Sequence, residues 1–92
     1  MDDRRSRARA LVAAALDAVE SELAAPRHGL CPEQLGTVRD GLRGYLVALE
    51  RGPLPPRRER GEGLGKLVAD AWPYDLPLGT LVLQAERAWR NA

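Results

Sequence analysis

The sequence lacks phenylalanine, and its only aromatic residues are two tryptophans and two tyrosines. A core without Phe must be built mainly from Leu, Val and Ala, and a core of this kind favours closely packed helices. Hydrophobic residues nevertheless make up 45% of the 92 residues, which excludes a chain that is disordered throughout. A chain of this length suits one compact domain, so we expect a single domain over residues 1–92.

Cysteine and histidine are equally scarce, since Cys31 and His28 are the only residues of their types. No disulfide can form within the chain, so nothing points to an oxidising compartment and we expect a cytoplasmic protein. Zinc sites use three or four such ligands, so we expect no metal site. A Cys31 thiolate with His28 as its base would be the most direct route to an enzyme. We favour instead a small buried Cys31 at a helix start and a solvated His28.

Long hydrophobic runs are also missing. The apolar residues 10–16 follow four arginines and so imitate the start of a signal peptide, but acidic residues interrupt the pattern from Asp17 onward. This run is also far shorter than the roughly 20 residues that a membrane-spanning helix needs. We therefore expect neither a targeting segment nor a membrane contact.

Charge of one sign is not in excess, because the formal net charge is +1. The chain has no overall field that would attract nucleic acid or an anionic membrane. No pair of carboxylates converges with an acid or base on one helix face. The glycine-rich residues 61–65 lack the preceding strand and the following Lys-Ser/Thr pair of a phosphate-binding loop. We expect no cofactor and no enzymatic activity.

Two long helical patterns dominate the first half of the chain, at about residues 3–25 and 32–51. Each has apolar residues at alternating spacings of three and four. These residues are Val12, Leu16, Val19 and Leu23 in the first pattern and Leu35, Val38, Leu42, Tyr45 and Leu49 in the second. Pro32 suits the first position of a helix, and Gly52, expected as a left-handed cap, ends the second helix with Pro53. The short connection predicts an antiparallel helical hairpin.

Residues 52–63 are rich in Pro, Gly and charge, with little to bury, and predict a mobile or partly extended linker. Beyond the linker, apolar residues at helical spacing predict two short helices, at about 64–72 and 78–90. Apolar stripes this small are not stable alone, so both helices should pack on the hairpin. The sequence thus predicts an all-α fold, a small helical bundle with two long and two short members.

The second helix carries three glycines, and each costs about 0.5–1 kcal/mol relative to Ala in a helix interior. Gly36 and Gly44 lie off the apolar seam, near Val47, where the missing side chains would let a second backbone approach. An equally good alternative is that both glycines are tolerated because they lie on an exposed face. Tyr74, between two prolines, is the best candidate for an exposed contact, whereas each Trp is more often a core residue. The possible interaction surface comprises Gly36, Gly44, Val47, Trp72, Tyr74 and Trp89.

Such a bundle can carry more apolar surface than one chain covers, and surplus apolar surface is usually an interface. The alternative is that the two short helices cover all of this apolar surface. The leading hypothesis is therefore a non-enzymatic protein–protein interaction module: a homodimer, an adaptor, or a small inhibitor or regulator of another protein.

The runner-up hypothesis is a small nucleic-acid-associated regulator that uses the N-terminal and linker arginines. Its possible contacts are Arg4, Arg5, Arg7, Arg9, Arg57, Arg58 and Arg60. Around a helix the first four of these point in several directions, so they do not form a one-sided stripe for phosphates. We expect nucleic acid to be the less favoured partner.

Overall fold

The computed structural model describes residues 3–60 and 63–92, and within these residues it contains helices and no strands. The helices are α1 (Asp3–Ala24), α2 (Pro32–Arg51), α3 (Gly63–Ala71) and α4 (Pro77–Asn91), with a short 3-10 turn, η1 (Arg57–Glu59). The predicted all-α fold is confirmed, and every predicted helix end lies within one residue of the observed one. Residues 61–62 of the predicted linker and glycine-rich stretch lie outside the described residues. No helix in the described ranges has the length and apolar character to cross a membrane.

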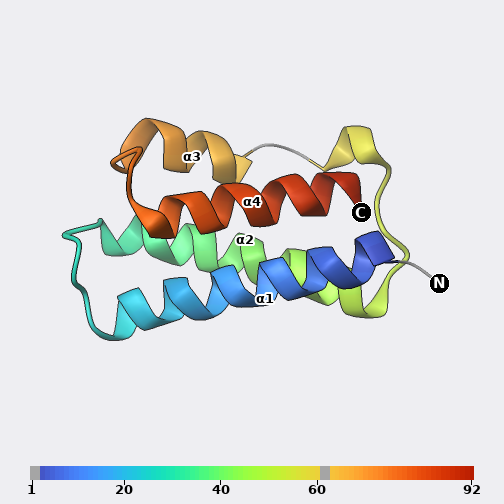
Figure 1. Cartoon of the computed structure of the whole chain (residues 1–92), viewed down its shortest axis with the longest axis horizontal. Coiled ribbons are helices and arrows are strands. Elements are labelled where there is room, and N and C mark those ends of the chain that lie inside the picture. Colours follow the sequence, from blue (N-terminus) through green and yellow to red (C-terminus); the bar gives the residue numbers. More distant parts are fainter. Residues whose placement is uncertain (1–2, 61–62) are drawn as a thin grey trace.

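Three helices form the body of the bundle, and the short α3 covers part of it. α1 packs along both α2 and α4, while α3 lies on α4 and touches α2. Figure 1 shows that α1 runs antiparallel to α2 and also to α4. The bundle measures 40 × 23 × 20 Å. The start of α1 and the ends of α2 and α4 therefore meet at the same end of the molecule.

α1 buries a wider stripe than its large apolar residues indicate. Ala8, Val12, Ala15 and Val19 are fully buried, at spacings of four, three and four, whereas Leu23, which we placed on the buried face, is only partly covered. The alanines face inward because α1 has a neighbour on each of two sides. Small side chains at such positions allow helices to pack closely.

The end of α2 is closed by an arginine from α1. Arg5 donates from Nε to the carbonyl of Leu49 at 2.8 Å and from Nη2 to that of Ala48 at 3.2 Å. Gly52 has a φ of 1°, so it is not the left-handed cap that we predicted. A Cβ at Gly52 would instead run into the Arg5 guanidinium. The glycine leaves the space that Arg5 occupies.

The segment after α2 contains a buried charge, although its composition predicts little to bury. Arg60, directly after η1, is buried. Its Nη1 donates to the carbonyls of Ala92, Trp89 and Arg90 at 2.8, 3.1 and 3.2 Å, and its Nε donates to the Pro55 carbonyl at 2.8 Å. The last carbonyls of a helix have no partner within it, so a guanidinium placed there can bind several at once. Arg60 thereby fastens the linker to the end of α4.

One glycine of α2 admits a neighbouring element, and it is neither of the two that we singled out. A Cβ at Gly41 would lie 2.8 Å from both δ-carbons of Leu64, the first buried residue of α3. A Cβ at Gly44 would meet no atom within 4 Å, and one at Gly36 would meet only the side chain of Arg39. Within the described chain, the close approach on α2 is therefore at Gly41.

Candidate binding face

The four N-terminal arginines separate into two pairs, as expected for consecutive turns of a helix. Arg5 holds the end of α2, and Arg9 Nη1 lies 3.9 Å from the Glu50 carboxylate, also on α2. Arg4 and Arg7 leave α1 on the side of α4 and line an open hollow there. Half of the cluster thus contacts the neighbouring helix α2, and the other half faces the hollow.

This α1–α4 hollow has a volume of about 740 Å³ and combines charged with apolar walls. Its arginines come from three segments: Arg4 and Arg7 from α1, Arg57 from η1 and Arg87 from α4. Leu11 and Ala88 supply apolar surface between them, and no carboxylate lines the hollow in the described part of the chain. We call these four arginines and the hollow they surround the arginine face.

The linker arginines also differ in their environments. The Arg60 guanidinium carbon lies 5.5 Å from the ring centre of Trp89, within the range of a cation–π contact. Arg57 donates to the Asn91 carbonyl at 3.4 Å while lining the hollow. Arg58 is exposed and lines neither this hollow nor its neighbour. Only Arg57 of the three belongs to the arginine face.

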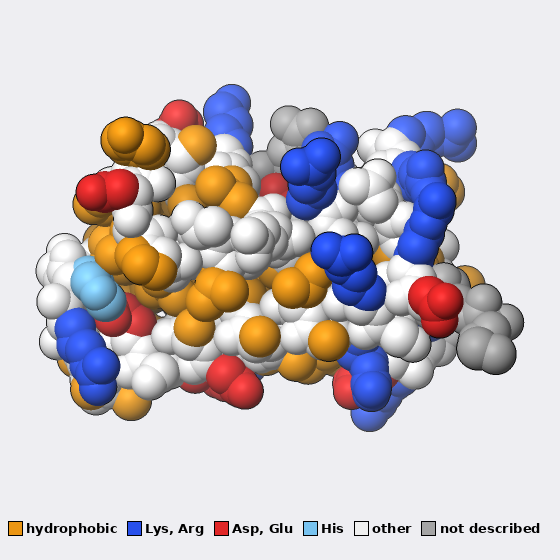
Figure 2. Space-filling view, viewed as in Figure 1, with side chains coloured by type: hydrophobic (Ala, Val, Ile, Leu, Met, Phe, Trp, Pro, Cys, Tyr) orange, Lys and Arg blue, Asp and Glu red, His pale blue; other side chains and the backbone are white. Residues whose placement is uncertain are grey.

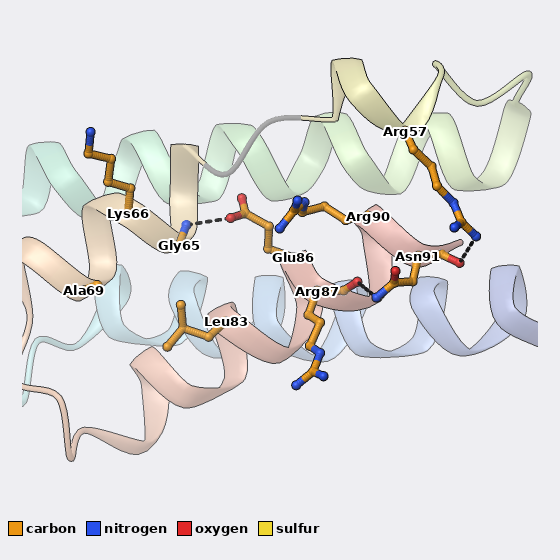
Figure 3. A pocket seen from close by; sticks show the side chains of 9 residues that line it. All are labelled: Arg57, Gly65, Lys66, Ala69, Leu83, Glu86, Arg87, Arg90 and Asn91. Carbon is orange, nitrogen blue, oxygen red and sulfur yellow. Dashed lines mark hydrogen bonds between the residues drawn. The ribbon is translucent and has the colours of Figure 1, made fainter.

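A second hollow of about 660 Å³ lies on the other side of α4, against α3, and shares Arg57 and Arg87 with the first. Figure 3 shows Arg87 directed toward α1 and Lys66 directed away from α4. Glu86 also lines this α3–α4 hollow. Lys66 and Arg90 line it as well, so this hollow holds as many basic side chains as the first. It differs from the α1–α4 hollow in having a carboxylate in its described lining, which offsets part of the positive charge.

Glu86 is a buried structural residue, with only 3% of its surface exposed. Its carboxylate accepts hydrogen bonds from the N–H groups of Leu64 and Gly65 at 3.1 and 2.8 Å and from the Tyr45 hydroxyl at 2.7 Å. It therefore caps the first turn of α3 from another helix, where the positive end of the helix dipole favours an anion. A Cβ at Gly65 would lie 2.7 Å from the carboxylate, so glycine leaves room for the cap.

Tyr45, which donates to Glu86, also contacts the core residue Trp89. Its ring stacks on Trp89, with centroids 4.6 Å apart and planes inclined by 12°. Burial, followed by the hydrogen bond and charge of Glu86, raises the pKa of the Tyr45 hydroxyl above its ordinary value. Tyr45 and Glu86 thus serve packing between helices, and the sequence carries no local signal for either contact.

Toward its other end, the line between α1 and α4 becomes apolar. Figure 2 shows Lys and Arg side chains gathered where α1 begins and α4 ends, and hydrophobic side chains along the rest of this line. A smaller hollow of about 220 Å³ opens there, with Ala18 of α1 and Leu78 and Leu81 of α4 as apolar walls. Glu22, Arg27 and His28 also line it, so charges of both signs are present. The surface between the two helices therefore changes from an excess of arginine to a mainly apolar lining with balanced charge.

The only histidine pairs with a carboxylate, not with the only cysteine. His28 Nδ1 lies 2.8 Å from Glu22, whose carboxylate also accepts the N–H groups of Arg27 and His28 at 2.9 and 3.0 Å. The Arg27 N–H is the main cause that lowers the pKa of Glu22, against the opposing effect of burial. Cys31 is exposed, so our prediction of a buried thiol was wrong. Glu22 therefore stabilises the α1–α2 loop through hydrogen bonds to two backbone N–H groups and to the imidazole.

The residues predicted for an interaction surface do not form one surface. Trp72 and Trp89 lie in the core, each only 4% exposed. Gly44 and Val47 are exposed on α2, whereas Tyr74 is 95% exposed in the turn between α3 and α4. The arginine face uses other residues, and Leu11, Arg87 and Ala88 were missed because nothing in the linear sequence places α1 beside α4.

No protein-family model, curated protein or solved structure matches this chain. The arginine face is accordingly interpreted from the geometry and chemistry of the chain itself.

Proposed function

We propose that the chain is a cytoplasmic, non-enzymatic module that binds another protein, as an adaptor or a small inhibitor or regulator, through the arginine face. The supporting observation is the α1–α4 hollow, where four arginines from three segments surround apolar surface. Arginine is enriched in protein interfaces because its planar guanidinium pairs with carboxylates in two parallel hydrogen bonds and its stem covers apolar surface.

The buried polar groups of the described chain favour binding over catalysis. Glu22 and Glu86 are the buried carboxylates, and each is hydrogen bonded to donors of the chain itself. A general base must reach the proton that it abstracts from a substrate. These two carboxylates instead stabilise a loop and the start of a helix.

Nucleic-acid binding is the second candidate, because the fold brings Arg4, Arg7 and Arg57 from two separate sequence clusters to one hollow. Guanidinium groups suit phosphates as well as carboxylates. Single-stranded nucleic acid also needs aromatic side chains on which bases stack, and the described lining of this hollow contains none. Protein is therefore the favoured partner.

Site-specific photo-crosslinking in the cells that make the protein tests this proposal. A photoreactive residue replaces Gln84, which is exposed within the α1–α4 hollow, or, as a control, Val47, which is exposed on α2. We expect a discrete protease-sensitive, nuclease-resistant adduct from position 84 and none from position 47. Adducts only from position 47 would move the interface to α2, and nuclease-sensitive adducts from position 84 would favour the second candidate.

A further inference from the structure

α1 presents a second helical stripe beside its buried one. Arg4, Arg7, Leu11, Ala14 and Ala18 follow at spacings of three, four, three and four, and none of them is fully buried. Residues at these spacings lie on one side of a helix. From Arg7 to Ala18 the stripe is about 16 Å long at the usual rise per residue. It starts basic and ends apolar.

α4, which runs antiparallel to α1, also has a stripe of incompletely buried residues. Leu81, Gln84, Ala88 and Asn91 follow at spacings of three, four and three and remain at least partly exposed. Leu81 lines the small hollow together with Ala18, and Ala88 lines the large hollow together with Leu11. The two stripes therefore border one line between α1 and α4, with a hollow toward each end and hydrophobic side chains along it (Figure 2). We call this line and its two hollows the furrow.

We infer that this furrow holds an amphipathic helix of the partner protein, with its acidic end over the arginine face and its apolar end over Ala18 and Leu81. This inference rests on the proposed function and specifies its partner. Charge complementarity decides the orientation, because the arginine face presents four guanidinium groups and no carboxylate in its described lining. The small hollow combines apolar walls with Arg27, His28 and Glu22, so it carries charges of both signs and attracts carboxylates less strongly.

A second copy of this chain is a poorer occupant than an acidic helix. A twofold axis across the furrow would place the arginines of each copy on the apolar end of the other. Guanidinium groups would then lie over Leu81 and beside Arg27, where the carboxylate in the described lining, Glu22, is already hydrogen bonded within the chain, which is unfavourable. The acidic helix satisfies both ends of the furrow at once.

Binding of designed peptides to the full chain tests the inference, with fluorescence anisotropy as the readout. The parent peptide is a helix of about 18 residues, long enough for the furrow, with glutamates in its first turns and leucines at helical spacing in its last. One control peptide has glutamine for every glutamate, and a second has serine for every leucine. We expect binding of the parent and roughly tenfold weaker binding of each control, with affinity falling as salt rises.

Two matched double variants locate the peptide on the protein. Arg7→Gln with Arg87→Gln removes two charges from the arginine face, and Arg39→Gln with Arg58→Gln removes two charges elsewhere. We expect about tenfold weaker binding for the first pair and a change within about twofold for the second. Equal thermal unfolding midpoints for the two variants and the natural chain would show that any loss of binding is not unfolding.

Three results would overturn the inference. Equal losses for the two double variants would show attraction by net charge alone. Tighter binding of an oligonucleotide of equal charge, with the same loss for the first pair, would assign the furrow to nucleic acid. Absence of peptide binding together with a protein adduct at position 84 would reject the acidic helix but keep the proposed function, whereas absence of both would reject both.

Discussion

Arg5 and Arg60 can be compared with Arg7 and Arg87, because all four lie near the end of the bundle where α1 begins and α4 ends (Figure 1). The first two donate to carbonyls at the ends of α2 and α4, whereas the second two line a hollow without a carboxylate in its described walls. Arginines that look alike in the sequence thus divide into a structural set and an open set. For the arginines of α1, the side of the helix from which the side chain leaves decides the set, and Arg60 joins the structural set from the segment directly after η1.

The helix dipoles explain why arginines concentrate at this end. α2 and α4 both end there, so the negative ends of two helix dipoles and their unpaired carbonyls lie close to one another. A positive side chain that reaches these carbonyls is favourable even without a partner protein, whereas one that does not reach them gains little. Arg5 and Arg60 donate hydrogen bonds to these carbonyls. The arginines of the arginine face lie beside them and line the furrow.

The largest change in stability is expected for a substitution of Arg60, and the matched control is its exposed neighbour Arg58. Arg60→Ala leaves several carbonyls at the end of α4 without donors and releases the linker, so we expect the free energy of unfolding to fall by about 2–3 kcal/mol. Arg58→Ala, in the adjoining 3-10 turn, should change it by less than about 0.5 kcal/mol. Urea denaturation of both variants checks this, and similar losses would remove Arg60 from the structural set.

A double-mutant cycle tests whether Arg5 and Gly52 act as one unit. Arg5→Ala removes two hydrogen bonds to the end of α2, and Gly52→Ala displaces the same guanidinium, so each should lower stability by about 1–2 kcal/mol. The double variant should be about as stable as the less stable single one, because the second change finds nothing left to displace. Additive losses in urea denaturation would contradict this account.

Helix ends were predictable from the sequence because each is marked by local chemistry. Pro32 and Pro77 stand at first helical positions, and α2 stops where Gly52 and Pro53 follow. Such signals act within one or two turns of the chain. The wrong details, a left-handed Gly52 and a linker with nothing to bury, both depend on arginines that arrive from elsewhere in the fold.

The candidate site was only half predictable for the same reason. The arginine clusters were visible in the sequence, and so was the fact that arginines at positions 4, 5, 7 and 9 of one helix cannot form a single stripe. The convergence of Arg7 with Arg87 requires α4 to lie antiparallel beside α1, a pairing between segments 80 residues apart. Apolar periodicity shows that a helix has a buried face but not which helix covers it.

A smaller loss of stability is expected for Arg9, which pairs with Glu50 of α2 at the surface. Arg9 Nη1 and the Glu50 carboxylate are 3.9 Å apart, and both side chains are about half exposed. Water and salt weaken such pairs, so Arg9→Gln should lower stability by no more than about 0.5 kcal/mol. Urea denaturation at low salt is the measurement, and a loss as large as that of Arg5→Ala would show that proximity to α2 matters more than contact with its carbonyls.

The smallest expected effect on stability has the opposite sign. Arg7 and Arg87 face one hollow with Arg4 and Arg57, so like charges repel there in the absence of an acidic partner. Arg7→Gln with Arg87→Gln should therefore leave the free energy of unfolding unchanged or raise it by up to about 0.5 kcal/mol at low salt. Added salt screens the repulsion, so this difference between the variant and the natural chain should shrink toward zero at about 0.5 M NaCl. Urea denaturation at both salt concentrations measures it. A variant less stable than the natural chain would place Arg7 and Arg87 in the structural set and leave the furrow without an open charge to attract an acidic helix.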